Sequence, residues 1–280
     1  MEILEGIKKI ECLTPLPDSA NKMQELFNYP TVDLHDMAEV ISIDPAITLS
    51  LLNYANNFFK SFEKIDSIDK ACTFLGAENI QKALINSFPN AHIRSYSPYE
   101  GFIWEHAIAS AYLSRIIAQE IDEEMGEIAY TAGLIHDFGE MILAQYFPEH
   151  FSKIVKKVMK NKISFLEAEK SLFNTTHIEI GRKVAEYWGL PLSLIDVIAF
   201  HHNPSESCYN SKLVSIVVFA DVVCNRLGIG FGINSCHNSI KHDILKITEI
   251  DDRKKENIVF SLQEILNENE SLRADWMDIN

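Results

Sequence analysis

Polar and apolar residues follow one another along the chain with the three-to-four-residue spacing of amphipathic helices, and strand-like alternation is nearly absent. A first helix is expected from about Asp18, and it must stop before Pro30. A second begins near Asp33 and ends before Pro45, because the residue that precedes a proline disfavours helical backbone. Pro45 then opens a third helix, since a first-turn residue needs no N–H donor. The pattern predicts a chain of short helices.

The same periodicity continues through the second half of the chain. Residues 67–88 indicate two short helices that are broken at Gly76. Residues 213–224 are apolar on most faces, which is typical of a buried helix. Glycines between residues 228 and 236 end this compact pattern. Together the segments predict an all-α fold, with further helices over residues 104–121, 176–188 and 252–269.

The composition favours a globular protein of one large or two modest domains. The chain has 280 residues, of which 47% are hydrophobic, so it can bury a substantial core. Its formal net charge of −15 repels phosphate backbones and disfavours broad electrostatic binding of nucleic acid. The basic run at residues 153–162 is more typical of a solvated helix face than of a binding patch.

Targeting and redox signals point to the cytoplasm. The first residues lack the basic start and apolar stretch of a signal peptide. The most apolar window, residues 213–224, is too short to span a bilayer. The five cysteines are widely spaced and include no CxxC pair, which argues against a disulfide framework and a zinc ribbon. We therefore expect a reduced, cytoplasmic protein without a membrane partner.

Histidines and aspartates of the second half form an ordered pattern that includes the stretch LIHDFGE, residues 134–140. A lone histidine near a helix end is usually a capping or core residue. Asp221 is harder to explain, because it lies in an apolar helix where a buried carboxylate without a partner is costly. The order is H…HD…H…HH…D, and its members are His106, His136, Asp137, His177, His201, His202 and Asp221.

Imidazoles and carboxylates in this combination suit zinc, manganese or iron. Five imidazoles and two carboxylates exceed what one tetrahedral ion needs. They suit two ions that share a bridging aspartate and keep positions open for water or a phosphate. The residue types therefore favour one or two divalent transition metals, whose identity stays open among iron, manganese and zinc. The alternative is that the histidines only satisfy one another inside a helix bundle.

The whole chain also resembles a known family. An opening Pro-x-Pro helix, an Asp-Pro-Ala segment ending in Ala-Asn-x-x-Phe, a Ser-Ile-x-x-Ala-x-x-x-Leu-Gly element and the histidine motifs follow in that family's order. In these features the chain resembles the HDOD (HD-related output domain) family of bacterial signalling proteins, a branch of the HD superfamily of metal-dependent phosphohydrolases. The similar segments are LTPLPDSANKMQELF (13–27), ISIDPAITLSLLNYANNFF (41–59), IDSIDKACTFLGAENI (65–80), WEHAIASAYLSRIIA, AGLIHDFGEMIL, THIEIGRKVAEYWGLP and IAFHHNP.

The resemblance covers residues 13–225 and implies two helical lobes within that domain. An N-terminal helical lobe, residues 13–95, would pack on an HD-like helical lobe, residues 96–225, that contains the metal site. Residues 226–280 match nothing in the family and are expected to form a C-terminal helical extension.

The resemblance also implies a role for each ligand. His136 and Asp137 would be the central pair, with Asp137 bridging two ions. One ion would be completed by His106 and Asp221, and the other by His177, His201 and His202.

Two departures from the cyclic di-GMP phosphodiesterase branch of the superfamily bear on activity. That branch has a lysine three residues after the aspartate, placed to meet a phosphate, whereas this chain has Glu140, which would repel one. The Gly-Tyr-Pro segment that should follow the paired histidines is also missing, since HHNPSESCYNS stands there. Hydrolysis of cyclic di-GMP is therefore disfavoured.

Three functions remain open from the sequence. The favoured one is a regulatory protein that binds metal in its second lobe and acts through a protein partner in a signalling pathway or a small phosphorylated ligand. The alternative is an active phosphohydrolase on another phosphoester, with Asp137 as the bridging metal ligand of the catalytic site. The third is a purely structural role for the histidines, in which their loss would lower stability without changing metal content.

Overall fold

The computed structural model describes residues 2–29, 33–58, 64–85 and 99–230, with a few single residues between 248 and 258. Every regular element in these ranges is a helix, so the all-α prediction is confirmed. The elements are α1 (Glu2–Gly6), η1 (Ile7–Lys9), α2 (Pro17–Phe27), α3 (Leu34–Ser42), α4 (Pro45–Phe58), α5 (Ile68–Leu84), α6 (Glu100–Ile121), η2 (Glu123–Met125), α7 (Gly126–Ile135), α8 (Phe138–Tyr146), α9 (Pro148–Asn161), α10 (Phe165–Phe173), α11 (His177–Tyr187), α12 (Leu192–Phe200), η3 (Pro204–Glu206) and α13 (Ser211–Arg226).

Local signals explain where the early helices begin and bend. Pro17 occupies the first turn of α2, and Asp33 caps α3 by accepting a hydrogen bond from the His35 amide. Gly76 interrupts α5 with φ 67° and ψ 168°, a backbone conformation that residues with a Cβ rarely adopt. The break that the sequence predicts at this glycine is therefore present, as a kink between two helical pieces.

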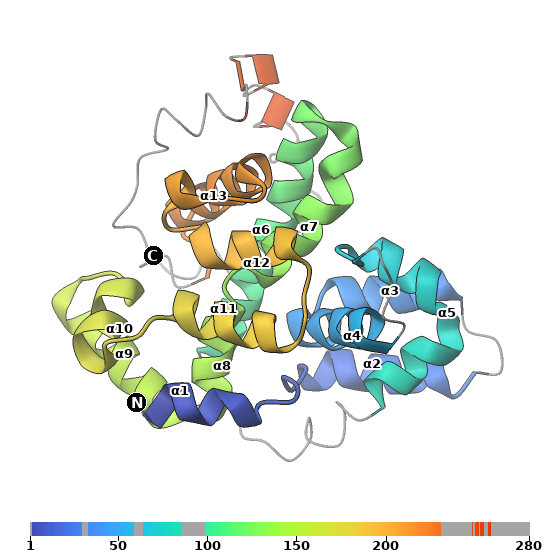
Figure 1. The fold of residues 1–280 in the computed structure, drawn as a ribbon, viewed down its shortest axis with the longest axis horizontal. Helices are drawn as coiled ribbons and strands as arrows, with labels where there is room; N and C mark the ends of the chain where they lie inside the picture. The colour runs from blue at the N-terminus through green and yellow to red at the C-terminus, as the bar shows by residue number, and fades with distance from the viewer. Residues whose placement is uncertain are drawn as a thin grey trace.

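Helices α2 to α5 form the first lobe, drawn in blue to cyan in Figure 1. The side chain of Asn56, near the end of α4, donates to the carbonyls of Leu52 and Ile65 and accepts from the Ile65 amide. Because one side chain holds both polar groups of Ile65, it fixes the point where the chain returns toward α5. This explains the asparagine of the Ala-Asn-x-x-Phe stretch.

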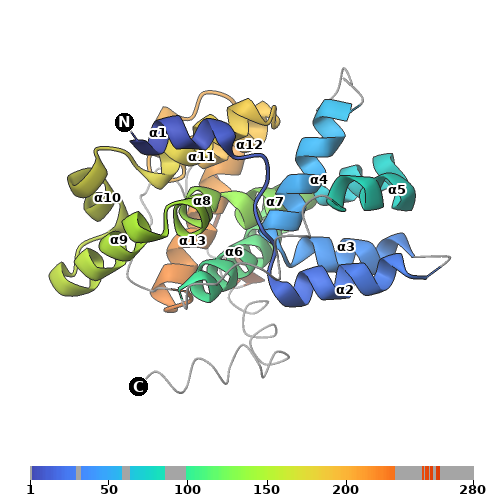
Figure 2. The same ribbon diagram turned by 90° about the horizontal axis from the view of Figure 1, so that it is seen from below.

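Helices α6 to α13 form the second lobe. The long helix α6 packs against α7 and α13, and α11 packs against α8 and α12, as Figures 1 and 2 show from two sides. The lobes meet where α4 and α5 contact α7. There the Ile68 amide of α5 donates to the Thr131 hydroxyl of α7, and nearby Asn57 of α4 donates to the Trp188 carbonyl at the end of α11. The predicted arrangement of a first helical lobe packed on a second is confirmed.

The residues before the first lobe lie on the second one. Ile3, Ile7 and Ile10 are buried, and the Trp188 indole donates to the Ile10 carbonyl. The η1 turn that follows α1 contacts α11, and Figure 2 draws α1 next to that helix. The N-terminal residues therefore contact the second lobe, although in the sequence they precede the first.

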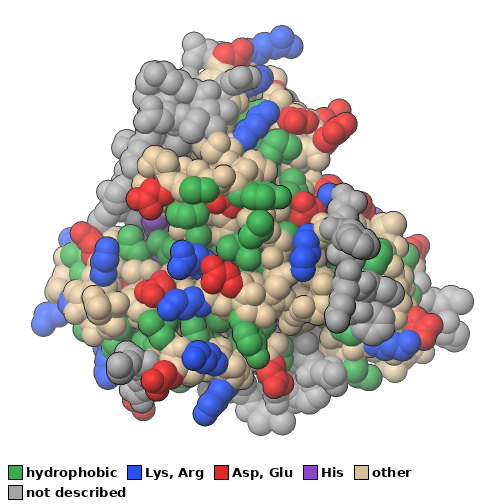
Figure 3. Space-filling view, viewed as in Figure 1, with side chains coloured by type: hydrophobic (Ala, Val, Ile, Leu, Met, Phe, Trp, Pro, Cys, Tyr) green, Lys and Arg blue, Asp and Glu red, His purple; other side chains and the backbone are tan. Residues whose placement is uncertain are grey.

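Charged side chains of both signs are interspersed across the face drawn in Figure 3. None of the described helices combines the length and hydrophobicity needed to cross a membrane. The predicted C-terminal helix over residues 252–269 lies largely outside the described residues. Among those that are described there, Ile258 is buried and Asn257 donates to Glu120 of α6.

Candidate metal centre

Two glycines let helices approach closely around the His136–Asp137 turn between α7 and α8. A Cβ on Gly133 would lie 2.6 Å from the Ser110 carbonyl oxygen of α6. A Cβ on Gly139 would overlap the carbonyl of His177, the first residue of α11. Since neither approach leaves room for a side chain, these glycines set the distance of α6 and α11 from the turn.

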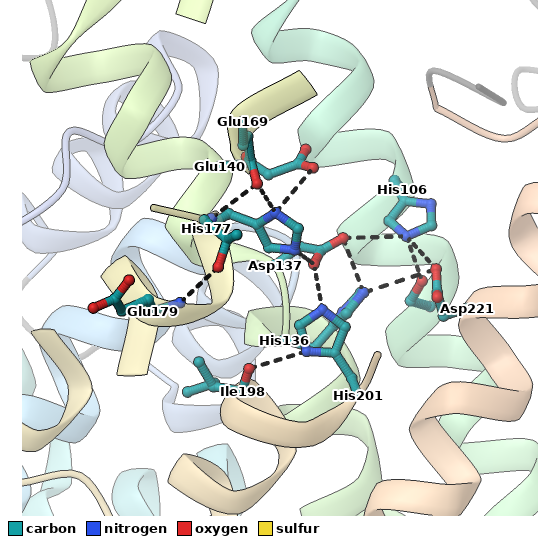
Figure 4. A network of polar contacts seen from close by, with 12 residues as sticks. His106, His136, Asp137, Glu140, Glu169, His177, Glu179, Ile198, His201 and Asp221 are labelled. Atoms are coloured by element: carbon teal, nitrogen blue, oxygen red, sulfur yellow. Dashed lines mark hydrogen bonds and ion pairs between the residues drawn. The ribbon is translucent and has the colours of Figure 1, made fainter. Parts of the chain in front are cut away.

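The structure brings all seven side chains that the sequence singled out to one place. They arrive from α6, the turn between α7 and α8, the start of α11, the end of α12 and the middle of α13. Figure 4 shows most of them converging on Asp137. Ligand atoms within 4.8 Å of one another define two groups that share Asp137, namely His106 with His136, and His177 with His201 and His202.

The two carboxylate oxygens of Asp137 face these two groups separately. Oδ2 lies 3.1 Å from His136 Nε2 and 3.8 Å from His106 Nε2. Oδ1 lies 3.0 Å from His201 Nε2 and 3.5 Å from His177 Nε2.

Asp221 joins the Oδ2 side, because its Oδ1 lies 3.1 Å from His106 Nε2 and 4.0 Å from His136 Nε2. We call His106, His136 and Asp221, which surround Asp137 Oδ2, the first subsite. We call His177, His201 and His202, on the side of Asp137 Oδ1, the second subsite. A carboxylate placed in this way is suited to bridge two ions.

The far ring nitrogens of three histidines are held by groups that can only accept. Nδ1 of His136 lies 2.8 Å from the Gly133 carbonyl, and Nδ1 of His201 lies 3.0 Å from the Ile198 carbonyl. Nδ1 of His177 lies 2.9 Å from a carboxylate oxygen of Glu169. Nδ1 must therefore donate in each ring, which leaves Nε2 as the lone-pair nitrogen of the neutral form.

These Nε2 atoms are buried together without ordinary partners. Nε2 of His136, His177 and His201, and Oδ1 of Asp137, have no hydrogen-bond partner among the described residues, although they stand at ion-pair distances from one another. A buried polar atom left unpaired costs roughly 1–3 kcal/mol. A cation at their meeting point would satisfy all of them at once, so the residues fit a transition metal with nitrogen and oxygen ligands.

Electrostatics keep the two aspartates ionised. Burial opposes charge on Asp137, but the neighbouring His136 and His201 hold its pKa well below the ordinary value. Burial likewise opposes charge on Asp221, while its hydrogen bond and charge interaction with His106 lower its pKa. Both carboxylates can therefore act as anionic ligands at neutral pH.

The histidines divide by their neighbours. Burial disfavours charge on His136 and His177, but the carboxylates of Asp137 and Glu169 respectively outweigh it and raise the pKa values to about 9 and about 10. Burial and the charge of neighbouring histidines hold the pKa of His202 well below its ordinary value. In the absence of metal, protons on His136 and His177 thus stand where a cation would bind.

Glu140 has a different place from the one that the sequence suggests. Its side chain is buried, and its Oε1 lies 4.0 Å from His177 Nδ1, on the side of the ring that faces Glu169 (Figure 4). Burial and the charge of Asp137 raise the pKa of Glu140 well above its ordinary value, which favours the neutral form. The repulsion expected between Glu140 and a phosphate is therefore weakened, while the absence of a lysine at this position stands.

Sequence reasoning missed Glu169, which contacts His177 from α10. Nothing in the spacing between them predicts this contact. A signal was present within α10 itself, because Glu169 follows buried Phe165 by four residues and buried Ala168 by one, which puts an acid on the buried face of the helix.

Comparisons with known proteins agree with this architecture. A family model described as "HDOD domain" matches residues 13–204. A solved structure of an HDOD domain protein of unknown function from Geobacter sulfurreducens superposes with a TM-score of 0.61 and 26% identity, covering 98% of this chain and 95% of that one.

Two curated proteins are similar in sequence over parts of the chain. An uncharacterized protein of Treponema pallidum is 26% identical over 222 residues, which are 78% of this chain and 43% of that protein. Ribonuclease Y of Thermus thermophilus is 27% identical over 139 residues, which are 50% of this chain and 19% of that enzyme. The chain thus spans less than half the length of each of these relatives.

Proposed function

Since the chain belongs to the HDOD family, we propose that it is a regulatory protein of signal transduction whose second lobe holds one or two divalent transition-metal ions. The single observation that carries the proposal is the convergence of three buried Nε2 atoms, without hydrogen-bond partners among the described residues, on the ionised Asp137. Without an ion, these atoms could be paired only through protonated rings beside Asp137, whereas a cation would satisfy all of them at once.

Each residue has a distinct task in this site. Asp137 would hold both ions, because its Oδ2 faces the first subsite and its Oδ1 faces the second. His106, His136 and Asp221 would complete the first subsite, and His177, His201 and His202 would complete the second. When bound, such ions supply Lewis acidity toward a phosphoryl oxygen and lower the pKa of a bound water. Iron, manganese and zinc all suit this set of ligands.

The regulatory assignment rests on what the site lacks for the known phosphodiesterase chemistry. Position 140 holds a buried glutamate in place of the phosphate-contacting lysine, and the Gly-Tyr-Pro segment is absent from the sequence. We propose that the metal-loaded lobe binds a protein partner or a small phosphorylated ligand in the cytoplasm. The net charge of −15 disfavours nucleic acid as that partner.

The test is metal content by elemental mass spectrometry on protein purified without chelator or metal-affinity tag, beside Asp137→Ala. We expect one to two equivalents of iron, manganese or zinc per chain in the wild type and none in the variant. A wild-type protein that is folded and takes up none of these metals when they are supplied would overturn the proposal.

Hydrolysis of a phosphoester is the second candidate, and the completeness of both subsites favours it. Ligands for two ions lie together in the second lobe, and the chain is similar over half its length to a protein named as a ribonuclease. Metal-loaded protein should then release phosphate or alcohol from a member of a phosphoester panel, and Asp137→Ala should abolish turnover. Turnover that persists in the variant would exclude this site as its source.

A further inference from the structure

Glu169 holds His177 through one oxygen. Its Oε2 accepts from the backbone amide of His177 at 3.1 Å and from the ring Nδ1 at 2.9 Å. Glu169 is 1% exposed and His177 is 2% exposed, so both bonds are shielded from water. Hydrogen bonds to a charged acceptor are stronger than those to a neutral carbonyl, especially in such surroundings.

The need for this contact follows from the position of His177 in its helix. His136 and His201 each lie at the end of a helix, and each ring reaches back three residues to a carbonyl of that helix's last turn. His177 is instead the first residue of α11 and has no helical turn before it. A ring at this end of a helix must find an acceptor elsewhere, and α10 supplies it.

The same oxygen also completes the start of α11. The N-cap side chain of Thr176 accepts from the Glu179 amide, so it does not serve the amide of His177. Amides of a first helical turn have no partner within the helix and attract negative charge. Glu169 therefore ties the start of the helix and the orientation of the ring into one contact.

From this geometry we propose that Glu169 is a positioning residue, which fixes His177 with Nε2 directed to the second subsite and thereby sets the affinity of the second ion. The inference deepens the proposed metal function and rests on it. Glu169 lies on the Nδ1 side of the ring, away from the Nε2 that faces Asp137. In the first subsite His136 relies instead on a carbonyl of its own helix.

The experiment compares Glu169→Ala and Glu169→Gln with Glu167→Ala in the same helix. Glu167 forms the capping box of α10 with Ser164, so its loss measures the effect of damage to α10 itself. Metal-free proteins are titrated with Mn²⁺ by calorimetry, and the Nδ1–H resonance of His177 is observed by NMR.

We expect Glu169→Ala to weaken one of the two ions by roughly 10- to 100-fold, the usual loss when a residue that orients a ligand is removed. The other ion keeps its affinity. Glu169→Gln keeps an amide oxygen that can accept both bonds, so its loss is smaller. The slowly exchanging Nδ1–H resonance of His177 disappears in Glu169→Ala and persists in Glu167→Ala.

Two results would overturn the inference while the proposed function stands. One is a Glu169→Ala protein that binds both ions with wild-type affinity, and the other is an equal loss in Glu169→Ala and Glu167→Ala. A wild-type protein that binds no ion defeats the proposed function instead, and the ligand role of His177 with it.

Discussion

Both lobes bury aspartates, and Asp44 of the first lobe and Asp137 of the second lie in opposite surroundings. Asp44 of the first lobe is fully buried and accepts from the amides of Leu16, Ala46 and Ile47. Asp137 of the second lobe is 6% exposed, yet its Oδ1 has no hydrogen-bond donor among the described residues. The two side chains are therefore almost equally buried, but Asp44 has several backbone donors and Asp137 Oδ1 has none among the described residues.

The pKa values follow the same division. Burial raises the pKa of Asp44 to about 6 against the opposing effect of its backbone hydrogen bonds. For Asp137 burial acts in the same direction, but His136 and His201 outweigh it and the pKa falls well below the ordinary value. Asp44 therefore serves the architecture, whereas Asp137 keeps its bonding capacity for a ligand. Four predictions test this difference.

Asp137→Ala should have the largest effect, on metal and not on the fold. Four-ligand zinc sites bind with roughly 10–16 kcal/mol, so one shared ligand is worth about 3 kcal/mol to each ion, or at least ~100-fold in affinity. Calorimetric titration of the metal-free variant measures this loss, and circular dichroism confirms that the helices remain. Unchanged affinity for both ions would place the metal elsewhere.

Asp44→Ala should show the reverse behaviour. Removal of the carboxylate leaves three amides in a buried setting without an acceptor, at about 1 kcal/mol each, so we expect a loss of about 3 kcal/mol in the free energy of unfolding. Denaturant titration measures it. The protein that remains folded should bind the wild-type number of ions, and a change in that number would undermine the separation between the two lobes.

Metal affinity should rise with pH. The pKa values of His136 and His177 are raised to about 9 and about 10, so at pH 7 the metal-free rings carry protons that an ion must displace. The metal-free state therefore binds more protons than the metal-bound state, and affinity increases by about tenfold per pH unit for each displaced proton. Competition with a chelating dye between pH 6 and pH 9 measures the slope. A flat profile contradicts the protonation assigned to these rings.

Asn225→Ala should give the smallest effect. Asn225 donates to Asp221 Oδ1 at 2.7 Å from a partly exposed position on α13. Loss of this bond is worth about 1 kcal/mol, or roughly fivefold in affinity for the ion of the first subsite. The ion of the second subsite should be unaffected, and a uniform loss at both subsites would show that they are not distinct.

Much of the fold could be predicted from the sequence, because its signals are local. Pro17 and Pro45 open helices, Asp33 caps one, and Gly76 kinks another, each through properties of one residue and its neighbours. The seven clustered side chains could also be named, since they follow a recognisable order along the chain. Their metal ligation remains a proposal, whereas their proximity is a property of the structure.

The contacts that escaped prediction are between helices. Glu169 reaches His177 only because α10 and α11 fold toward each other across a bend. Gly139 matters because it leaves room for a carbonyl 38 positions later in the chain, and no local pattern encodes that approach. The sequence identified position 140 as important, but it could not predict that the Glu140 side chain is buried beside His177.

The residues that precede the first lobe have a consequence for synthesis. The Ile10 carbonyl binds the Trp188 indole across a sequence separation of 178 residues. At a translation rate of roughly 5–20 residues per second, Ile10 emerges about 10–35 s before its partner. During that interval only part of the second lobe can cover Ile3, Ile7 and Ile10. We expect the nascent chain to depend on a holding chaperone until α11 emerges, although the finished protein buries these residues well.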